Sequence, residues 1–201
     1  MTHFKLANVL FASDDFMVQN SELFYRSEGM TRPDSDGSAL AFTGEVDFLT
    51  YFNAFSNAKW RKYTSIDNVW LHLELSGAPC DVVFEELGQD GTLRPAQTPL
   101  ARVAVAADAQ IVDVQLPDST SALVGFKLVS KDEARVSGAY FYTVVDEERI
   151  RPVNLAVSTT TFRKEEFILP NIEAIKRDVL GSDEPIAHSF HLFVVDNGRT
   201  L

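Results

Sequence analysis

From about residue 4 to residue 145, short hydrophobic segments are joined by polar turns, a pattern that predicts β-strands, and in one segment the alternation of hydrophobic and polar residues also predicts a buried face. That segment is 69–76, in which every second residue is valine or leucine. Turn formers separate further segments that predict strands, at 4–11, 22–26, 81–85, 102–106, 111–116, 122–128 and 136–144, and the segment 31–38 is expected to be a loop. Short strands joined by turns, with no helical period between them, predict a β-sandwich that is jelly-roll-like.

The pattern changes after the segment 146–152, which is charged and ends in proline. Segments of this kind often separate domains, so we place a β-sandwich domain at 1–150 and a second domain at 151–201. In the second domain, the pattern of hydrophobic and polar residues predicts a strand at 154–158, a polar turn at 159–164, an amphipathic helix at 165–180 and a strand at 190–195. Pro170 is expected to kink the first turns of this helix, unless the helix begins near Leu169. The expected fold class is therefore mainly β, a β-sandwich followed by a truncated α/β strand–helix–strand unit.

Polar residues follow both predicted strands of the second domain, with three threonines at 159–161 and Asp196 and Asn197 after the second strand. Open α/β sheets bind ligands at the carboxyl ends of their strands. One strand–helix–strand unit cannot cover a parallel sheet, because such a sheet normally needs helices on both faces. We therefore expect residues 151–201 to be the first part of a larger domain that continues beyond Leu201.

Composition narrows the classes of function. The formal net charge of −11 argues against nucleic-acid binding, which needs a basic face, and against electrostatic docking on anionic lipid. Cys80 is the only cysteine, which excludes an internal disulfide, and its apolar surroundings predict a buried thiol. No stretch is apolar enough for a membrane span, and the first residues do not form a signal peptide. These features predict a cytoplasmic protein; peripheral association with the inner face of a membrane and homo-oligomerisation stay open.

Two short motifs in the second domain resemble a known enzyme family. The segments 161–164 (Thr-Phe-Arg-Lys) and 194–198 (Val-Val-Asp-Asn-Gly) are similar to the strand ends that open the catalytic domain of family 2 glycosyltransferases. The aromatic run 50–55 and the pair Trp60–Arg61 resemble, more narrowly, the all-β domain of the polymerising galactofuranosyltransferases of that family. The resemblance implies a GT-A catalytic domain and a sugar, galactofuranose in the narrower reading, transferred from a UDP-sugar donor to a growing cell-surface glycan.

The resemblance also implies which residues bind the donor: Thr160, Thr161, Phe162, Arg163, Lys164 and Asp196. A turn that leads into a helix supplies backbone N–H donors for a diphosphate, and a carboxylate at the second strand end accepts hydrogen bonds from uracil or ribose. The family pattern has asparagine at the third position of the first motif and arginine at the fourth, where this sequence has Arg163 and Lys164. Which of these two cations faces the phosphates therefore stays open, and both are also ordinary residues for a solvated first helical turn.

No catalytic residue and no metal ligand is assigned within this sequence. The resemblance implies a general base and an Asp-rich motif that holds Mg²⁺ or Mn²⁺, and both are expected beyond Leu201. We therefore expect these 201 residues to be inactive alone. The alternative, from another class of function, is a carbohydrate-binding or assembly-mediating β-sandwich without catalysis.

Trp60 and Tyr51 are the candidates for glycan contact in the first domain, because aromatic rings stack on sugars. Aromatic residues also dominate buried surface, so packing in the core or at a domain interface is the interpretation that we favour for this aromatic run.

Overall fold

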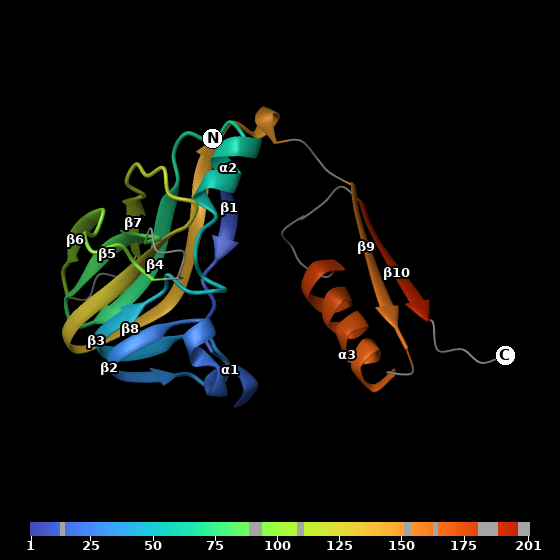
Figure 1. Cartoon of the computed structure of the whole chain (residues 1–201), viewed down its shortest axis with the longest axis horizontal. Helices are drawn as coiled ribbons and strands as arrows, with labels where there is room; N and C mark the ends of the chain where they lie inside the picture. Colours follow the sequence, from blue (N-terminus) through green and yellow to red (C-terminus); the bar gives the residue numbers. More distant parts are fainter. Residues whose placement is uncertain are drawn as a thin grey trace. The chain divides into compact units, whose positions relative to one another are not determined.

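The computed structural model describes residues 1–12, 15–88, 94–107, 111–150, 154–162, 165–180 and 189–196. The chain divides into two compact units, Met1–Val145 and Asp146–Leu201, and each is described by itself (Figure 1). The first unit is an antiparallel β structure, and the second contains two parallel strands and a helix. The prediction of a mainly β, sandwich-like fold is confirmed.

Eight described strands form the sheet of the first unit: β1 (Thr2–Asn8), β2 (Arg26–Pro33), β3 (Leu40–Asp47), β4 (Trp70–Gly77), β5 (Cys80–Glu86), β6 (Ala101–Val105), β7 (Ile111–Gln115) and β8 (Val124–Val145). Two short helices, α1 (Asp15–Gln19) and α2 (Asn57–Tyr63), lie in the connections, together with a 3₁₀ turn at Ser21–Leu23. A second 3₁₀ turn, Glu147–Arg149, follows β8.

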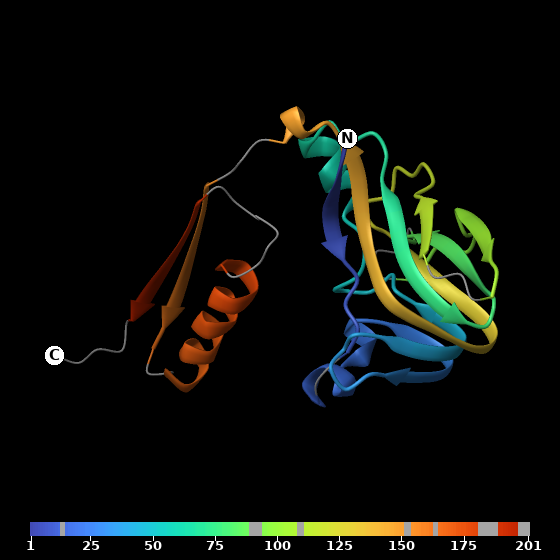
Figure 2. The same cartoon turned by 180° about the vertical axis from the view of Figure 1, so that it is seen from behind.

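The strand β8 organises this unit. It runs for 22 residues and pairs antiparallel with β1, β3, β4 and β5. Residues 127–129 of β8 lie between β3 and β5, whereas residues 140–142 lie between β4 and β1. Figures 1 and 2 show this long strand curving along its length, so that its two ends belong to two layers of the sandwich. The strands β2, β6 and β7 extend these layers by pairing with β3, β5 and β4 respectively.

A chain of phenylalanine rings fills the space inside the sandwich. Phe48 stacks on Phe126 at 4.9 Å between ring centroids, Phe126 meets Phe141 edge-on at 6.1 Å, and Phe141 stacks on Phe55 at 4.8 Å. All four side chains are buried. Phe126 lies near the start of β8 and Phe141 near its end, so these rings connect the two parts of the core along this strand. Aromatic pairs of this kind add about 0.5–1.5 kcal/mol each beyond the area that they bury.

Several predicted boundaries in the first unit differ from the structure. The segments 122–128 and 136–144 were predicted as two strands, but from Val124 on they belong to the single strand β8, whose pairing with β3 resumes at Ala134 after a register shift that passes over residues 131–133. The first three residues of the predicted loop at 31–38 belong to β2, and the strand Leu40–Asp47 was not predicted. The predicted strand at 22–26 is wrong except for Arg26, where β2 begins, and its first two residues belong to the 3₁₀ turn. The prediction for Cys80 is confirmed: the thiol is buried, and burial raises its pKa to about 11.

The second unit consists of β9 (Asn154–Thr161), α3 (Glu165–Ile175), a π-helical turn (Lys176–Leu180) and β10 (Ser189–Asp196). The strands β9 and β10 pair in parallel along eight residues each, so the predicted strand–helix–strand unit is present. The predicted turn at 159–164 is wrong for its first three residues, because the threonines 159–161 continue β9; their branched side chains favour strand geometry. The helix begins at Glu165 and includes Pro170, so the alternative start near Leu169 is wrong.

A charged cluster connects β3, β8 and β5 in the first unit. Lys127 Nζ donates to Glu45 Oε2 at 2.8 Å and lies 3.3 Å from Glu85 Oε1. Glu85 is only 5% exposed, and burial is the largest cause that raises its pKa; the negative charge of Asp47 adds to the rise, and Lys127 opposes it. Glu85 therefore holds its negative charge at a cost to the folded state.

The raised pKa of Glu85 predicts a pH-dependent effect of the variant Glu85→Gln. From about pH 4.3, the usual value for glutamate, up to the folded pKa, the folded state binds more protons at this position than the unfolded state. The free energy of unfolding of the wild type is therefore reduced as pH rises through this window. Denaturant unfolding should show the stability of Glu85→Gln relative to wild type increasing from pH 4 to pH 7. An equal difference at both pH values would contradict the assignment.

Candidate functional site

The carboxyl ends of β9 and β10 form the candidate site that the sequence predicted. The parallel register places Asp196 opposite Thr161 and Val195 opposite Thr160, so both strands end at the same edge of the pair. Three of the six predicted donor-binding residues, Thr160, Thr161 and Asp196, are thus neighbours in the structure, although Thr161 and Asp196 lie 35 positions apart in the sequence.

The two threonines at this edge differ in their surroundings. Side chains alternate along β9, and Thr161 follows Leu155, Val157 and Thr159 on the more buried face, whereas Thr160 lies on the exposed face. The Oγ1 atom of Thr161 is enclosed and has no hydrogen-bond partner among the described residues. A buried hydroxyl without a partner costs free energy, so Thr161 offers a donor and an acceptor that a ligand at the strand ends can satisfy.

Of the other predicted residues of this site, the structure describes only Phe162. Phe162 follows β9 directly, and its side chain is 60% exposed. Arg163 and Lys164 lie outside the described residues, as do Asn197 and Gly198. The structure therefore brings together the hydroxyl-bearing and acidic positions of the prediction, and the choice between Arg163 and Lys164 as the phosphate-facing cation stays a prediction.

Trp60 and Tyr51, the candidates for glycan contact, occupy different environments. Trp60 lies on α2, is half-buried and packs against the hydrophobic core. Tyr51 lies in the turn before α2, is 72% exposed and meets the ring of Phe52 edge-on at 5.0 Å. Trp60 lines a small polar pocket beside α2, and Tyr51 is not among the residues that line it.

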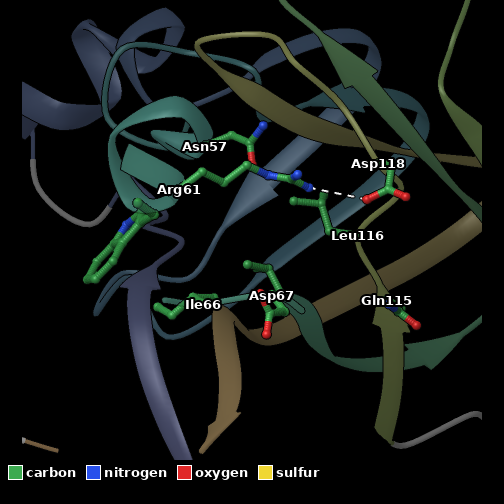
Figure 3. Close-up of a pocket in the computed structure, with 9 residues that line it drawn as sticks. Asn57, Arg61, Ile66, Asp67, Gln115, Leu116 and Asp118 are labelled. Carbon is green, nitrogen blue, oxygen red and sulfur yellow. Dashed lines mark hydrogen bonds and ion pairs between the residues drawn. The ribbon is translucent and has the colours of Figure 1, made fainter. Parts of the chain in front are cut away.

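Figure 3 shows this pocket, in which Arg61 extends from α2 toward Asp118 in the segment after β7. The Arg61 guanidinium lies 3.3 Å from Asp118 Oδ1, and its Nε donates to Asn57 Oδ1 at 3.2 Å. Asn57 in turn donates to the carbonyl oxygens of Ser119 and Ser121, at 2.9 and 3.2 Å. These bonds attach α2 to the segment after β7, so the polar groups of the pocket are largely occupied in holding the fold together.

Sequence reasoning missed Asn57 and Asp118 as parts of this pocket. A signal for Asn57 was present, because Asn57 and Arg61 are four residues apart in a segment that forms a helix, and such pairs face each other. No comparable signal existed for Asp118, which reaches the pocket only through the folding of the chain after β7.

The described residues contain no group of three or more His, Cys, Asp or Glu side chains that could hold a metal ion. Within the same residues, no helix is both long and apolar enough to cross a membrane.

The burial of Trp60 predicts a structural role. Trp60→Ala should lower the free energy of unfolding by roughly 1–3 kcal/mol, because it removes a half-buried aromatic ring from the core. Tyr51→Ala is the matched control, since its ring is mostly exposed, and it should change stability by no more than about 0.5 kcal/mol. Thermal and denaturant unfolding of the full chain measure both effects. A Trp60→Ala variant as stable as wild type would contradict the packing interpretation.

Comparisons with known proteins give a family match and a curated relative. Residues 17–144 match the family model described as galactofuranosyltransferase 2 N-terminal. A curated protein, galactofuranosyltransferase GlfT2 of Mycolicibacterium smegmatis, is 27% identical to this chain over 137 residues, which are 68% of this chain and 21% of that protein. The chain thus spans about a fifth of the length of this relative.

Solved structures give weaker likenesses. The Gap123 glycosylation-associated complex of Streptococcus agalactiae has a TM-score of 0.38 at 12% identity, over 85% of this chain and 37% of that one. The xylanase 10B modules of Clostridium thermocellum, in complex with xylohexaose, have a TM-score of 0.41 at 6% identity, over 86% of this chain and 36% of that one. Neither likeness is strong enough to support an inference about fold or function.

Proposed function

The chain belongs to the family of galactofuranosyltransferase 2 N-terminal domains, and from this premise we propose that it serves as the N-terminal part of an enzyme that transfers galactofuranose from a UDP-sugar to a growing glycan. The match over residues 17–144 carries this proposal, because it covers most of the unit Met1–Val145. In this proposal the β-sandwich precedes the catalytic domain, and residues 151–201 open the GT-A domain that binds the donor.

The neighbouring positions of Thr161 and Asp196 support the second half of the proposal. We assign the unpartnered Thr161 hydroxyl to a hydrogen bond with the nucleotide, and the Asp196 carboxylate to an N–H of uracil or a hydroxyl of ribose. Arg163 and Lys164 are the candidates for contact with the diphosphate, because cations bind phosphate oxygens through charge-assisted hydrogen bonds. Thr160 and Phe162 complete the proposed donor-binding set.

The described residues are assigned neither the metal nor the general base. Within the part of the chain that the structure describes, no group of three or more His, Cys, Asp or Glu side chains could hold a metal ion. Mg²⁺ or Mn²⁺, which the family resemblance implies, would belong to the large part of the relative that lies outside the match. We propose that the residues of this chain supply the strand ends that face the nucleotide. We also propose that the reaction takes place in the cytoplasm.

Binding of UDP to the isolated chain tests the donor site. The variant Asp196→Asn should bind UDP at least tenfold more weakly, because hydrogen bonds to a charged group contribute about 1.5–3 kcal/mol. Glu173→Gln is the matched control: Glu173 is an exposed carboxylate on α3 that pairs with Lys176 at 2.7 Å, outside the proposed site. Isothermal titration or ligand-observed NMR measures both variants. Equal UDP affinity in wild type and Asp196→Asn, or equal losses in both variants, would overturn the assignment.

Transfer activity of the 201 residues tests the remaining part of the proposal. Incubation with UDP-galactofuranose, Mg²⁺ or Mn²⁺ and an acceptor oligosaccharide should give no product, because the proposed general base and metal ligands lie outside this chain. Protein-dependent formation of a longer oligosaccharide would show that these 201 residues contain the catalytic groups after all.

A further inference from the structure

A groove of about 400 Å³, lined mainly by charged residues, lies on the first unit. Four neighbouring strands, β2, β3, β8 and β5, contribute to its lining, and Arg94, before β6, also takes part. The residues next to these lining positions, such as Val46, Leu128 and Phe84, are buried in the core, so the groove occupies the outer face of this part of the sheet. Its charged side chains are Arg26, Glu28, Glu45, Asp47, Glu85, Arg94 and Lys127.

Ion pairs fix most of these side chains in place. Arg26 donates to Asp47 Oδ2 at 2.6 Å and to the carbonyl oxygen of Leu49 at 2.8 Å. Lys127 bridges Glu45 and Glu85 from the next strand. Because Glu45, Asp47 and Glu85 each already have a cationic partner, a metal ion would have to displace Lys127 or Arg26 to bind to these carboxylates. The groove is therefore better suited to a neutral ligand than to a cation.

Glu85 supplies the observation that points to a ligand. Its side chain lies among the groove residues and is only 7% exposed. One carboxylate oxygen, Oε1, faces Lys127, whereas Oε2 is enclosed and has no hydrogen-bond partner among the described residues. Buried polar atoms nearly always have a partner, so Oε2 requires a hydrogen-bond donor.

We propose that this groove binds a neutral saccharide chain, whose hydroxyl groups donate to the carboxylates of Glu85 and Glu45 and accept from Lys127 and Arg94. Carboxylates only accept hydrogen bonds, and ammonium and guanidinium groups only donate them. A ligand for this lining must offer donors and acceptors side by side without net charge, which is what neighbouring sugar hydroxyls provide. The identification of this saccharide as the acceptor glycan, held away from its reacting end, rests on the proposed function.

Titration of the full chain with a galactofuranose oligosaccharide, in the absence of UDP, tests the groove. NMR should show shifts concentrated on β2, β3, β5 and β8, and isothermal titration should give a measurable affinity. Glu85→Gln keeps the shape of the side chain but replaces one of the two acceptor oxygens with an NH₂ donor. This variant should weaken binding at least tenfold. Arg94→Ala is the second variant, because Arg94 lies outside the strands and its loss tests the groove even where Glu85→Gln disturbs the fold.

Two control variants separate this groove from other surfaces. Glu74→Gln changes a half-exposed carboxylate on β4, which is not among the groove residues, and should leave saccharide affinity unchanged. Trp60→Ala changes the pocket beside α2, and loss of binding in that variant, with full binding in Glu85→Gln and Arg94→Ala, would overturn the proposal in favour of that pocket. No binding of the oligosaccharide, or stabilisation by Ca²⁺ instead of saccharide, would also overturn it. Because UDP is absent, failure here is distinct from failure of the donor site, which Asp196→Asn tests.

Discussion

Backbone pairing along β8 is the constraint on which the first unit depends. Four strands take hydrogen bonds from this one strand, and they do so at different points along its 22 residues. A strand of this length can serve two layers only if it twists and curves, which is the natural tendency of strands built from L-residues. Gly125 near its start is close to the backbone of Leu49, where a Cβ atom would lie 2.8 Å from Leu49 Cα. The absence of a side chain at this position therefore lets the segment after β3 approach β8.

The same strand produces both the core and the charged groove, because successive side chains point to opposite faces. Phe126 and Leu128 point into the sandwich, and Lys127, between them, points outward to Glu45 and Glu85. The register of β3 and β5 on either side of Lys127 decides which carboxylates it meets. A slip of one residue in either strand would bury charge and expose phenylalanine or leucine, so the ionic network and the hydrophobic core select the same register.

The sequence carried enough information for the strands that alternate clearly, such as 69–76, and for the strand–helix–strand order of the second unit. It did not reveal that 122–128 and 136–144 are one strand, because the charged residues between them suit a turn, whereas β8 continues through them with a register shift in its pairing with β3. The neighbouring positions of Thr161 and Asp196 followed from a general property of parallel strands, so they could be predicted. The groove could not be, since Arg26, Glu45, Glu85 and Lys127 are far apart in sequence and meet only through the order β2-β3-β8-β5.

Glu85 connects the stability of this unit to its proposed ligand. Burial raises the pKa of its carboxyl, which means that the charged form is held against a desolvation cost that Lys127 offsets only in part. A saccharide hydroxyl that donates to Oε2 would favour the charged form and bring the pKa back toward its usual value. Ligand binding and ionisation of Glu85 are then thermodynamically linked: protonation of Glu85 at acid pH removes the acceptor that the ligand uses, and the bound ligand resists that protonation. A group that is desolvated at a cost in the empty protein would thus contribute to the affinity for the proposed ligand.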